Sequence, residues 1–276
     1  MALAAATNYG KSVGRLLRRR RPRLDALRRP AEERLTFVVG SPRSGTTFLG
    51  GALGAQPGAI DLGEVHPWKA AIPELVGLDE EQAARRLRRT LEVVRGAGLV
   101  RDLRGIEQTP ETAYVLAAAL RAYPQARAVH ALRDGRDVVC SLLEQGWLSA
   151  GREGRDDARL AFGAHVRFWV EPERREEFAQ ASEATRAAWA WRRYVEAARS
   201  VGERTLELRY EQLVADPAAA AELLAEHLSL APASLAASLA AAHGRSVGRW
   251  RSDLTAEQLA DVEREAGPLL RELGYA

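Results

Sequence analysis

The amino-acid sequence predicts an α/β fold, a three-layer sandwich in which a central parallel sheet carries helices on both faces. Two observations lead to it. Short apolar runs rich in β-branched residues alternate along the chain with longer stretches that have helical spacing. The first of these runs, LTFVVG at 35–40, ends in a glycine, and a loop of small and hydroxyl residues joins it to a helical pattern. In such sheets ligands bind beyond the carboxyl ends of the strands, so the loops there should carry the site.

Each element follows from its own local pattern. Strands are expected at 35–40, at the start of AIDLGEVHPWK (59–69), at ARAVHAL (126–132) and at RTLELRY (204–210). Helical spacing covers 46–56, 79–96, 110–122, 182–200, 217–229, 232–242 and 255–273, and RDGRDVVCSLLEQ predicts a turn that opens one more helix. Residues 146–172 have no regular pattern, and 243–253 should form a loop. No internal repeat or low-complexity linker interrupts 35–276, which predicts one domain there.

Residues 1–34 form a basic arm, expected to be flexible or helical. They hold ten Lys or Arg and three acidic residues, a net charge of +7, against +3 for the whole chain, which leaves −4 for the body at 35–276. The arm is expected to be a solvated segment. Peripheral contact with anionic lipid or an acidic partner is the alternative, and a transit peptide is disfavoured by the acidic residues. Since the body is slightly acidic, no nucleic-acid partner is expected.

The remaining composition narrows the class of protein. A single cysteine, Cys140, excludes an intramolecular disulfide, and no Cys/His cluster or acidic set predicts a metal site. No apolar run approaches the roughly 18 residues of a membrane span, and no secretory signal is visible. These features predict a cytoplasmic protein; the sequence carries no indication of its oligomeric state.

The loop at 40–47, in VVGSPRSGTTFL, has the chemistry of an anion site. Its glycine spacing nearly fits the P-loop motif G-x-x-x-x-G-K-[ST], but a threonine stands in place of the lysine. Backbone N–H groups of such a loop, at a helix N-terminus, stabilise an anion. We expect Ser44, Gly45, Thr46 and Thr47 to contribute to this cradle, and Arg43 to add a permanent positive charge. The alternative is a turn that merely packs a helix onto a strand.

A second loop, RDGRDVVCS at 133–141, also joins a strand to a helix. Arg133 is the first residue after the strand, and Ser141 lies two turns into the helix, so both can point toward the same edge of the sheet. The alternative is structural, because an Arg133–Asp137 or Asp134–Arg136 ion pair would tighten the turn.

Together these loops resemble a family, the sulfotransferases that use 3′-phosphoadenosine 5′-phosphosulfate (PAPS). GSPRSGTTFL is similar to their 5′-phosphosulfate loop, in the form of the tyrosylprotein and related bacterial branch, and RDGRDVVCS to their 3′-phosphate motif, with Arg133 and Ser141 in the phosphate-binding places. LRYEQLVADP resembles a third block, whose tyrosine, here Tyr210, lies against the nucleotide. RSVGRWRSDLT resembles the C-terminal block, whose basic residue, here Arg249, reaches the cofactor. The resemblance runs from about 36 to 275.

The resemblance implies a P-loop-like fold and an enzyme that moves a sulfuryl group from PAPS to an acceptor hydroxyl without a metal. PAPS has no β,γ-phosphate pair for a lysine and magnesium to bridge, which accounts for the threonine. In DLGEVHPW, Glu64 matches the glutamate that takes the acceptor's proton, while Arg43 would stabilise the transferring group. His66 is the rival base. Relatives often carry E-K-T-P where this chain has EQTP, so Gln108 brings a hydrogen-bond donor without a charge.

The acceptor pocket is expected in the irregular, aromatic stretch 146–172, with Trp147, His165 and Trp169, and beside the base, with His66 and Trp68. Aromatic faces suit a sugar, a phenol or a lipid headgroup equally. Two rival functions remain: a P-loop kinase or NTPase, disfavoured by the missing lysine, and a non-catalytic binding protein on the same scaffold.

Overall fold

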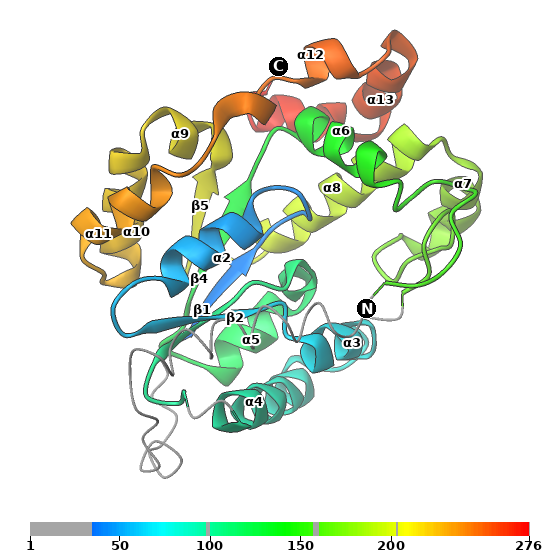
Figure 1. Cartoon of the computed structure of the whole chain (residues 1–276). Coiled ribbons are helices and arrows are strands. Elements are labelled where there is room, and N and C mark those ends of the chain that lie inside the picture. The colour runs from blue at the N-terminus through cyan, green and yellow to red at the C-terminus, as the bar shows by residue number, and fades with distance from the viewer. Residues whose placement is uncertain (1–34, 98–99, 157–159, 203, 276) are drawn as a thin grey trace.

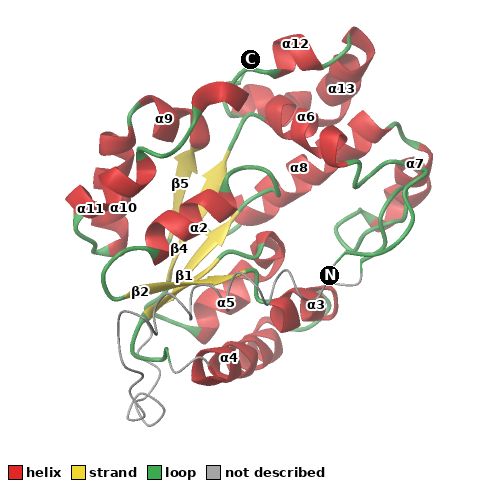
Figure 2. Cartoon of the chain, in the orientation of Figure 1, coloured by secondary structure: helices red, strands yellow, loops and turns green. Residues whose placement is uncertain are grey.

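Five parallel strands form one sheet in the order β2-β3-β1-β4-β5 (Figure 1). The structure, a computed structural model, describes residues 35–97, 100–156, 160–202 and 204–275. The strands are β1 (Leu35–Val39), β2 (Ala59–Gly63), β3 (Arg104–Glu107), β4 (Arg127–Leu132) and β5 (Thr205–Arg209). Helices surround this sheet (Figure 2), so the predicted α/β class is confirmed.

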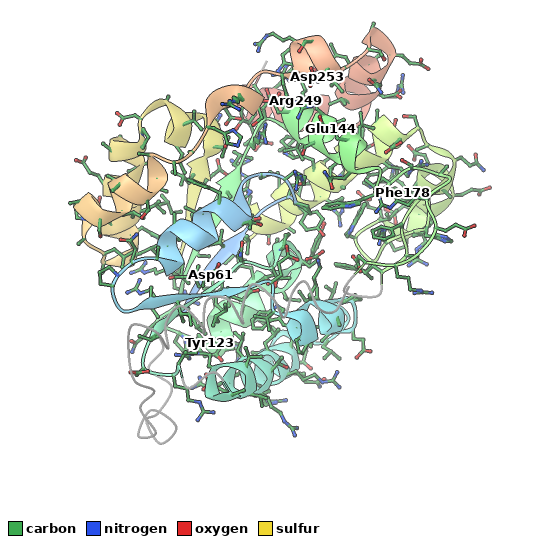
Figure 3. All side chains as sticks on the ribbon, in the orientation of Figure 1. Asp61, Tyr123, Glu144, Phe178, Arg249 and Asp253 are labelled. Atoms are coloured by element: carbon green, nitrogen blue, oxygen red, sulfur yellow. The ribbon has the colours of Figure 1, made fainter. Side chains whose placement is uncertain are left out.

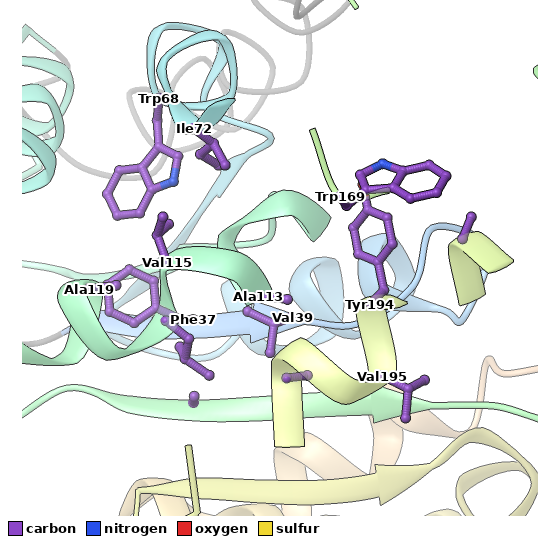
Figure 4. Close-up of a cluster of buried hydrophobic side chains, with 14 of the residues drawn as sticks. Phe37, Val39, Trp68, Ile72, Ala113, Val115, Ala119, Trp169, Tyr194 and Val195 are labelled. Carbon is purple, nitrogen blue, oxygen red and sulfur yellow. The ribbon is translucent and has the colours of Figure 1, made fainter. Parts of the chain in front are cut away.

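The central strands are apolar on both faces because both are covered. Along β1, Phe37 and Val39 belong to one hydrophobic cluster, and Val38 between them belongs to the other. This alternation follows from the two-residue period of a strand. Figure 4 shows Phe37 and Val39 within the larger cluster, whose members come from widely separated parts of the chain. A short, continuously apolar run is the sequence pattern that such a strand requires.

The helices form two layers. Side chains of four helices pack on the sheet in the smaller cluster, namely α2 (Thr46–Gly54), α9 (Tyr210–Ala215), α10 (Pro217–Leu228) and α11 (Pro232–Leu239). The larger cluster on the opposite face contains side chains of α3 (His66–Leu75), α4 (Glu80–Ala97), α5 (Leu116–Ala122), α6 (Gly135–Gln145), α7 (Arg175–Gln180), α8 (Glu183–Arg199) and α13 (Ala256–Glu272). A short helix α12 (Trp250–Asp253) and three 3₁₀ turns, Pro110–Val115, Pro172–Arg174 and Gly244–Ser246, complete the fold.

Most expected elements are present, with a few differences that have local causes. Strand β3 was not expected, because Ile106 is the one large apolar side chain in its four residues. It nevertheless lies between β2 and β1, pairing with both. Helix α3 occupies residues expected to be loop; its prolines at positions 67 and 73 hid the helical pattern. The helix expected at 110–122 begins as the 3₁₀ turn before α5.

The arm at 1–34 and its expected contacts lie outside the described residues. Among the residues that the structure does describe, no helix is long and apolar enough to cross a membrane.

Candidate active site

The loop between β1 and α2 is tightly bent at the carboxyl edge of the sheet. Arg43 has φ 74° and Gly45 has φ 94°, both in the left-handed region, which a non-glycine residue rarely adopts. Gly45 is the N-cap of α2 and supplies no side chain, so the first N–H groups of the helix have no side-chain cap. Ser44 and Thr46 are buried, whereas Arg43 and Thr47 are exposed. The loop therefore has the backbone geometry expected of an anion cradle.

The second loop lies directly against the first. Arg43 Nε donates to Ser141 Oγ at 2.8 Å, and Arg133 Nη1 donates to the Arg43 carbonyl at 3.2 Å. These contacts join residues 98 and 90 positions apart in the chain. Strands β1 and β4 are neighbours in the sheet, so their following loops share one edge. The structure thus brings together the residues of the two motifs.

Both structural ion pairs considered for the second loop are present as well. Arg136 Nη2 lies 2.8 Å from Asp134 Oδ2, while Arg133 Nη2 lies 3.9 Å from Asp137 Oδ2. Asp137 is engaged more closely elsewhere, because its carboxylate accepts from the backbone N–H of Gly248 at 2.7 Å and of Trp250 at 3.0 Å. Asp137 fastens the C-terminal block to α6.

Tyr210 is the first residue of α9, and its ring lies against the first loop at Gly45. A Cβ added to Gly45 would lie 2.9 Å from its ring, and the Arg133 guanidinium carbon lies 5.1 Å from the ring centroid. The Tyr210 hydroxyl donates to the His243 carbonyl at 3.1 Å. The third block therefore meets both phosphate-type loops.

Arg249 is placed differently from the other motif residues. It is held by two carboxylates, with its Nη1 3.1 Å from Glu144 Oε2 and its Nε 2.6 Å from Asp253 Oδ2 (Figure 3). This pairing lowers the pKa of Glu144 below its usual value. Among the described residues, Arg249 forms no hydrogen bond or ion pair with the loop at 40–47. A role for Arg249 at a ligand would require an exchange of these partners.

Glu64 is paired with a lysine that sequence analysis did not identify. Lys69 Nζ lies 2.8 Å from Glu64 Oε2 and 3.8 Å from Glu111 Oε1. Burial raises the pKa of the Glu111 carboxyl, and the Lys69 charge opposes that shift. Lys69 lies in the first half of α3, so an assignment of that helix would have placed it near Glu64.

A cavity of about 340 Å³ opens beside these groups. Pro42 of the first loop, Glu64, Trp147 and Trp169 all contribute to its wall. The Arg43 guanidinium carbon also lies 6.0 Å from the ring centroid of Trp147, so the cavity adjoins the loops. Five further charged side chains line it: Lys69, Glu111, Arg152, Asp156 and Arg167. Sequence analysis did not single out any of these five.

Comparison with known proteins identifies the family of this chain. The model of the sulfotransferase family matches residues 78–233, which include Arg133, Ser141 and Tyr210 and begin after the loop at 40–47. The chain belongs to the sulfotransferase family. No curated protein matches it.

Solved sulfotransferase structures have the same fold. The sulfotransferase domain of the Synechococcus PCC 7002 olefin synthase is 17% identical, with a TM-score of 0.53 over 85% of this chain and 94% of that one. The domain from the curacin biosynthetic pathway is 15% identical, with a TM-score of 0.56 over 85% and 96%. Sulfotransferase STF1 of Mycobacterium tuberculosis is 16% identical, with a TM-score of 0.53 over 96% and 83%. At these identities the likeness concerns the fold.

Two of the residues expected in the acceptor pocket of this sulfotransferase lie elsewhere. Trp68 is fully buried and packs on Phe37, with ring centroids 5.8 Å apart (Figure 4), so its assignment to the pocket is wrong. It faces the core because α3 is a helix whose apolar stripe covers the sheet. His165 is exposed and does not line the cavity. His66 begins α3, and its side chain lies outside the described residues.

Gln108, which replaces the lysine of many relatives, is used inside the protein. It is buried, and its Nε2 donates to Asp61 Oδ1 at 3.3 Å. Its side chain also lies so close to Gly50 of α2 that a Cβ there would approach it to 2.9 Å. Gln108 thus packs between α2 and β2. Within the described ranges, no group of three or more His, Cys, Asp or Glu side chains is arranged to hold a metal ion.

Proposed function

We propose that this sulfotransferase moves a sulfuryl group from PAPS to the hydroxyl of an acceptor bound in the cavity lined by Glu64. The observation that carries the proposal is the direct contact between the two loops, Arg43 to Ser141 at 2.8 Å and Arg133 to the Arg43 carbonyl at 3.2 Å. Residues of two separate phosphate-type motifs therefore converge at one edge of the sheet, next to that cavity.

The residues present fit such a donor. The buried Ser44 hydroxyl and the buried Arg133 Nε have no hydrogen-bond partner within the described part of the chain. Buried polar atoms of this kind are normally satisfied, and an anionic ligand supplies the missing acceptors. The N-terminus of α2 adds backbone donors with a favourable dipole. PAPS, when bound, supplies the activated sulfuryl group on its 5′-phosphate.

Each protein group then has a defined task. Arg133 and Ser141 hold the 3′-phosphate, and the ring of Tyr210 lies against the nucleotide. Arg43, exposed at the tip of the first loop, provides positive charge where charge builds up on oxygen during transfer. Glu64 accepts the proton of the acceptor hydroxyl, and Lys69 holds the Glu64 carboxylate in place through the 2.8 Å ion pair.

Donor recognition is tested by calorimetric titration with 3′-phosphoadenosine 5′-phosphate, adenosine 5′-phosphate and ATP. The 3′-phosphorylated nucleotide should bind most tightly. Arg133→Ala should weaken its binding by about tenfold or more, because a charge-assisted hydrogen bond contributes about 1.5–3 kcal/mol. The same change should leave adenosine 5′-phosphate nearly unaffected.

Arg127 provides the matched control, since it is exposed at the opposite end of the strand that precedes Arg133. Arg127→Ala should bind all three nucleotides like the original chain. Equal affinity for adenosine 5′-phosphate with and without the 3′-phosphate would contradict the role given to Arg133. Preference for ATP would favour the kinase alternative.

A further inference from the structure

Arg167 is a buried cation in the wall of the cavity, without a partner among the described residues. Its side chain is 8% exposed, and it lines the cavity together with Glu64. No hydrogen bond or ion pair of its guanidinium is found among the described residues, and its buried Nε is without an acceptor. A guanidinium offers five N–H donors in a planar fork, so an empty fork in a buried position is unusual.

The other buried arginines show what the fold normally provides. Arg95 donates to Glu92 at 3.2 Å and to the Arg101 carbonyl at 2.9 Å. Arg186 donates to the Leu148 carbonyl at 2.8 Å. Arg133 and Arg136 are likewise hydrogen-bonded, to the carbonyl of Arg43 and to the Asp134 carboxylate. Arg167 is thus the one of the five buried arginines of the described chain whose guanidinium makes no hydrogen bond.

The carboxylates near Arg167 do not form a contact pair with it. Burial lowers the pKa of the Arg167 guanidinium, and the charges of Asp156 and Glu111 oppose that shift. Neither carboxylate forms an ion pair with it, and Glu111 is itself 3.8 Å from Lys69, which binds Glu64 at 2.8 Å. The positive charge of Lys69 is therefore shared by two carboxylates, while that of Arg167 lines the cavity without a contact partner among the described residues.

The remainder of the wall is apolar and aromatic. Trp147 and Trp169 contribute faces, and Leu142, Leu160 and Phe162 add further apolar surface. A ligand of this cavity needs an apolar part that packs on the aromatic wall. It also needs an anionic group that accepts hydrogen bonds from the Arg167 guanidinium, because burial of an unpaired charge is unfavourable.

We propose that the cavity takes an acceptor with an apolar body and an anionic oxygen group, a carboxylate or a phosphate, which pairs with Arg167 while the acceptor hydroxyl meets Glu64. Arg167 is then the residue that determines acceptor specificity. The claim that the bound molecule is the acceptor rests on the proposed function, whereas the claim that an anion binds at Arg167 does not. Carboxylate and phosphate both match the fork in a bidentate manner, so both are tested.

The test compares three probes that share a phenol ring: 4-hydroxyphenylacetate, 4-hydroxyphenyl phosphate and the neutral 4-hydroxyphenylacetamide. Their binding to the full chain is followed by titration calorimetry. At least one anionic probe should bind about tenfold or more tightly than the amide, and the better of the two identifies the anion. Equal affinity for all three would overturn the proposal.

Two variants locate the effect. Arg167→Met should abolish the preference for the anionic probe. Arg152→Met is the matched control, since Arg152 also lines the cavity but already donates to the Gln145 carbonyl and lies 4.5 Å from the Phe162 ring centroid. It should retain the preference. A preference that survives Arg167→Met, or that disappears only in Arg152→Met, would refute the assignment.

Thermal unfolding of the same variants separates binding from structure. Because no residue in the described part of the chain pairs with the Arg167 charge, Arg167→Met should melt at the same temperature as the original chain or higher. A large fall in melting temperature would mean that the fold itself uses the guanidinium, which would overturn the inference. Arg167→Met should still bind 3′-phosphoadenosine 5′-phosphate. If the original chain fails to bind that nucleotide yet keeps an Arg167-dependent preference for anions, the proposed function is wrong and only the anion site at Arg167 stands.

Discussion

Glu107, at the end of β3, should make the stability of the protein fall as the pH rises. Its carboxylate is completely buried and accepts hydrogen bonds from Thr109 N at 2.8 Å and Thr112 Oγ1 at 2.9 Å. Burial raises its pKa from 4.5 to about 8, against the effect of these hydrogen bonds, and the negative charge of Glu64 adds to the rise. At neutral pH the folded protein therefore holds a proton on Glu107 that the unfolded chain has released.

The direction and size of the effect follow from this difference. Below pH 4.5 both the folded and the unfolded state carry the proton, and the contribution of Glu107 to the free energy of unfolding is fully present. Between pH 4.5 and about 8 only the folded state carries it, so the free energy of unfolding falls by about 1.4 kcal/mol per pH unit. Over the whole window the loss from this one group amounts to about 5 kcal/mol, and above pH 8 it levels off.

Glu107→Gln replaces the protonated carboxyl by a neutral group of the same shape, which keeps an oxygen acceptor for Thr109 N. Urea denaturation at several values between pH 5 and 9 measures the effect. The variant should be close to the original chain at pH 5 and more stable by several kcal/mol at pH 9. Glu81→Gln, at an exposed position paired with Arg85, is the control and should show no such trend. Parallel stability curves for the original chain and Glu107→Gln would refute the reasoning.

Two further predictions concern the loop at 40–47 and the base. Gly45→Ala should lower the free energy of unfolding by about 1–3 kcal/mol and weaken nucleotide binding, because φ is 94° and the new Cβ would meet the Tyr210 ring at 2.9 Å. Gly51→Ala in α2, where a Cβ meets open space, should instead raise it by up to about 1 kcal/mol, and urea denaturation of both distinguishes the sites. Glu64→Gln should reduce sulfuryl transfer by about 10²–10⁴ while nucleotide affinity stays constant, with exposed Glu74→Gln as the control. Normal turnover in Glu64→Gln together with an inactive His66→Ala would move the base to His66.

The local elements and the chemistry of the loops could be predicted from the sequence. The apolar, β-branched run LTFVV, closed by a glycine, predicted β1, and the short apolar run RAVHAL predicted β4. Parallel strands place their following loops at one edge, and on that ground alone Arg43, Arg133 and Ser141 could be expected to meet.

Which side chains are buried, and which residues they pack against, depends on how the elements pack together. Trp68 and Trp147 look equally aromatic in sequence, but the apolar stripe of α3 turns the first into the core, while the second lines the cavity. The raised pKa of Glu107 and the unpartnered fork of Arg167 likewise exist only after remote elements have closed around them. Desolvation depends on everything that surrounds a group, and those neighbours come from distant parts of the chain, so no local pattern encodes it.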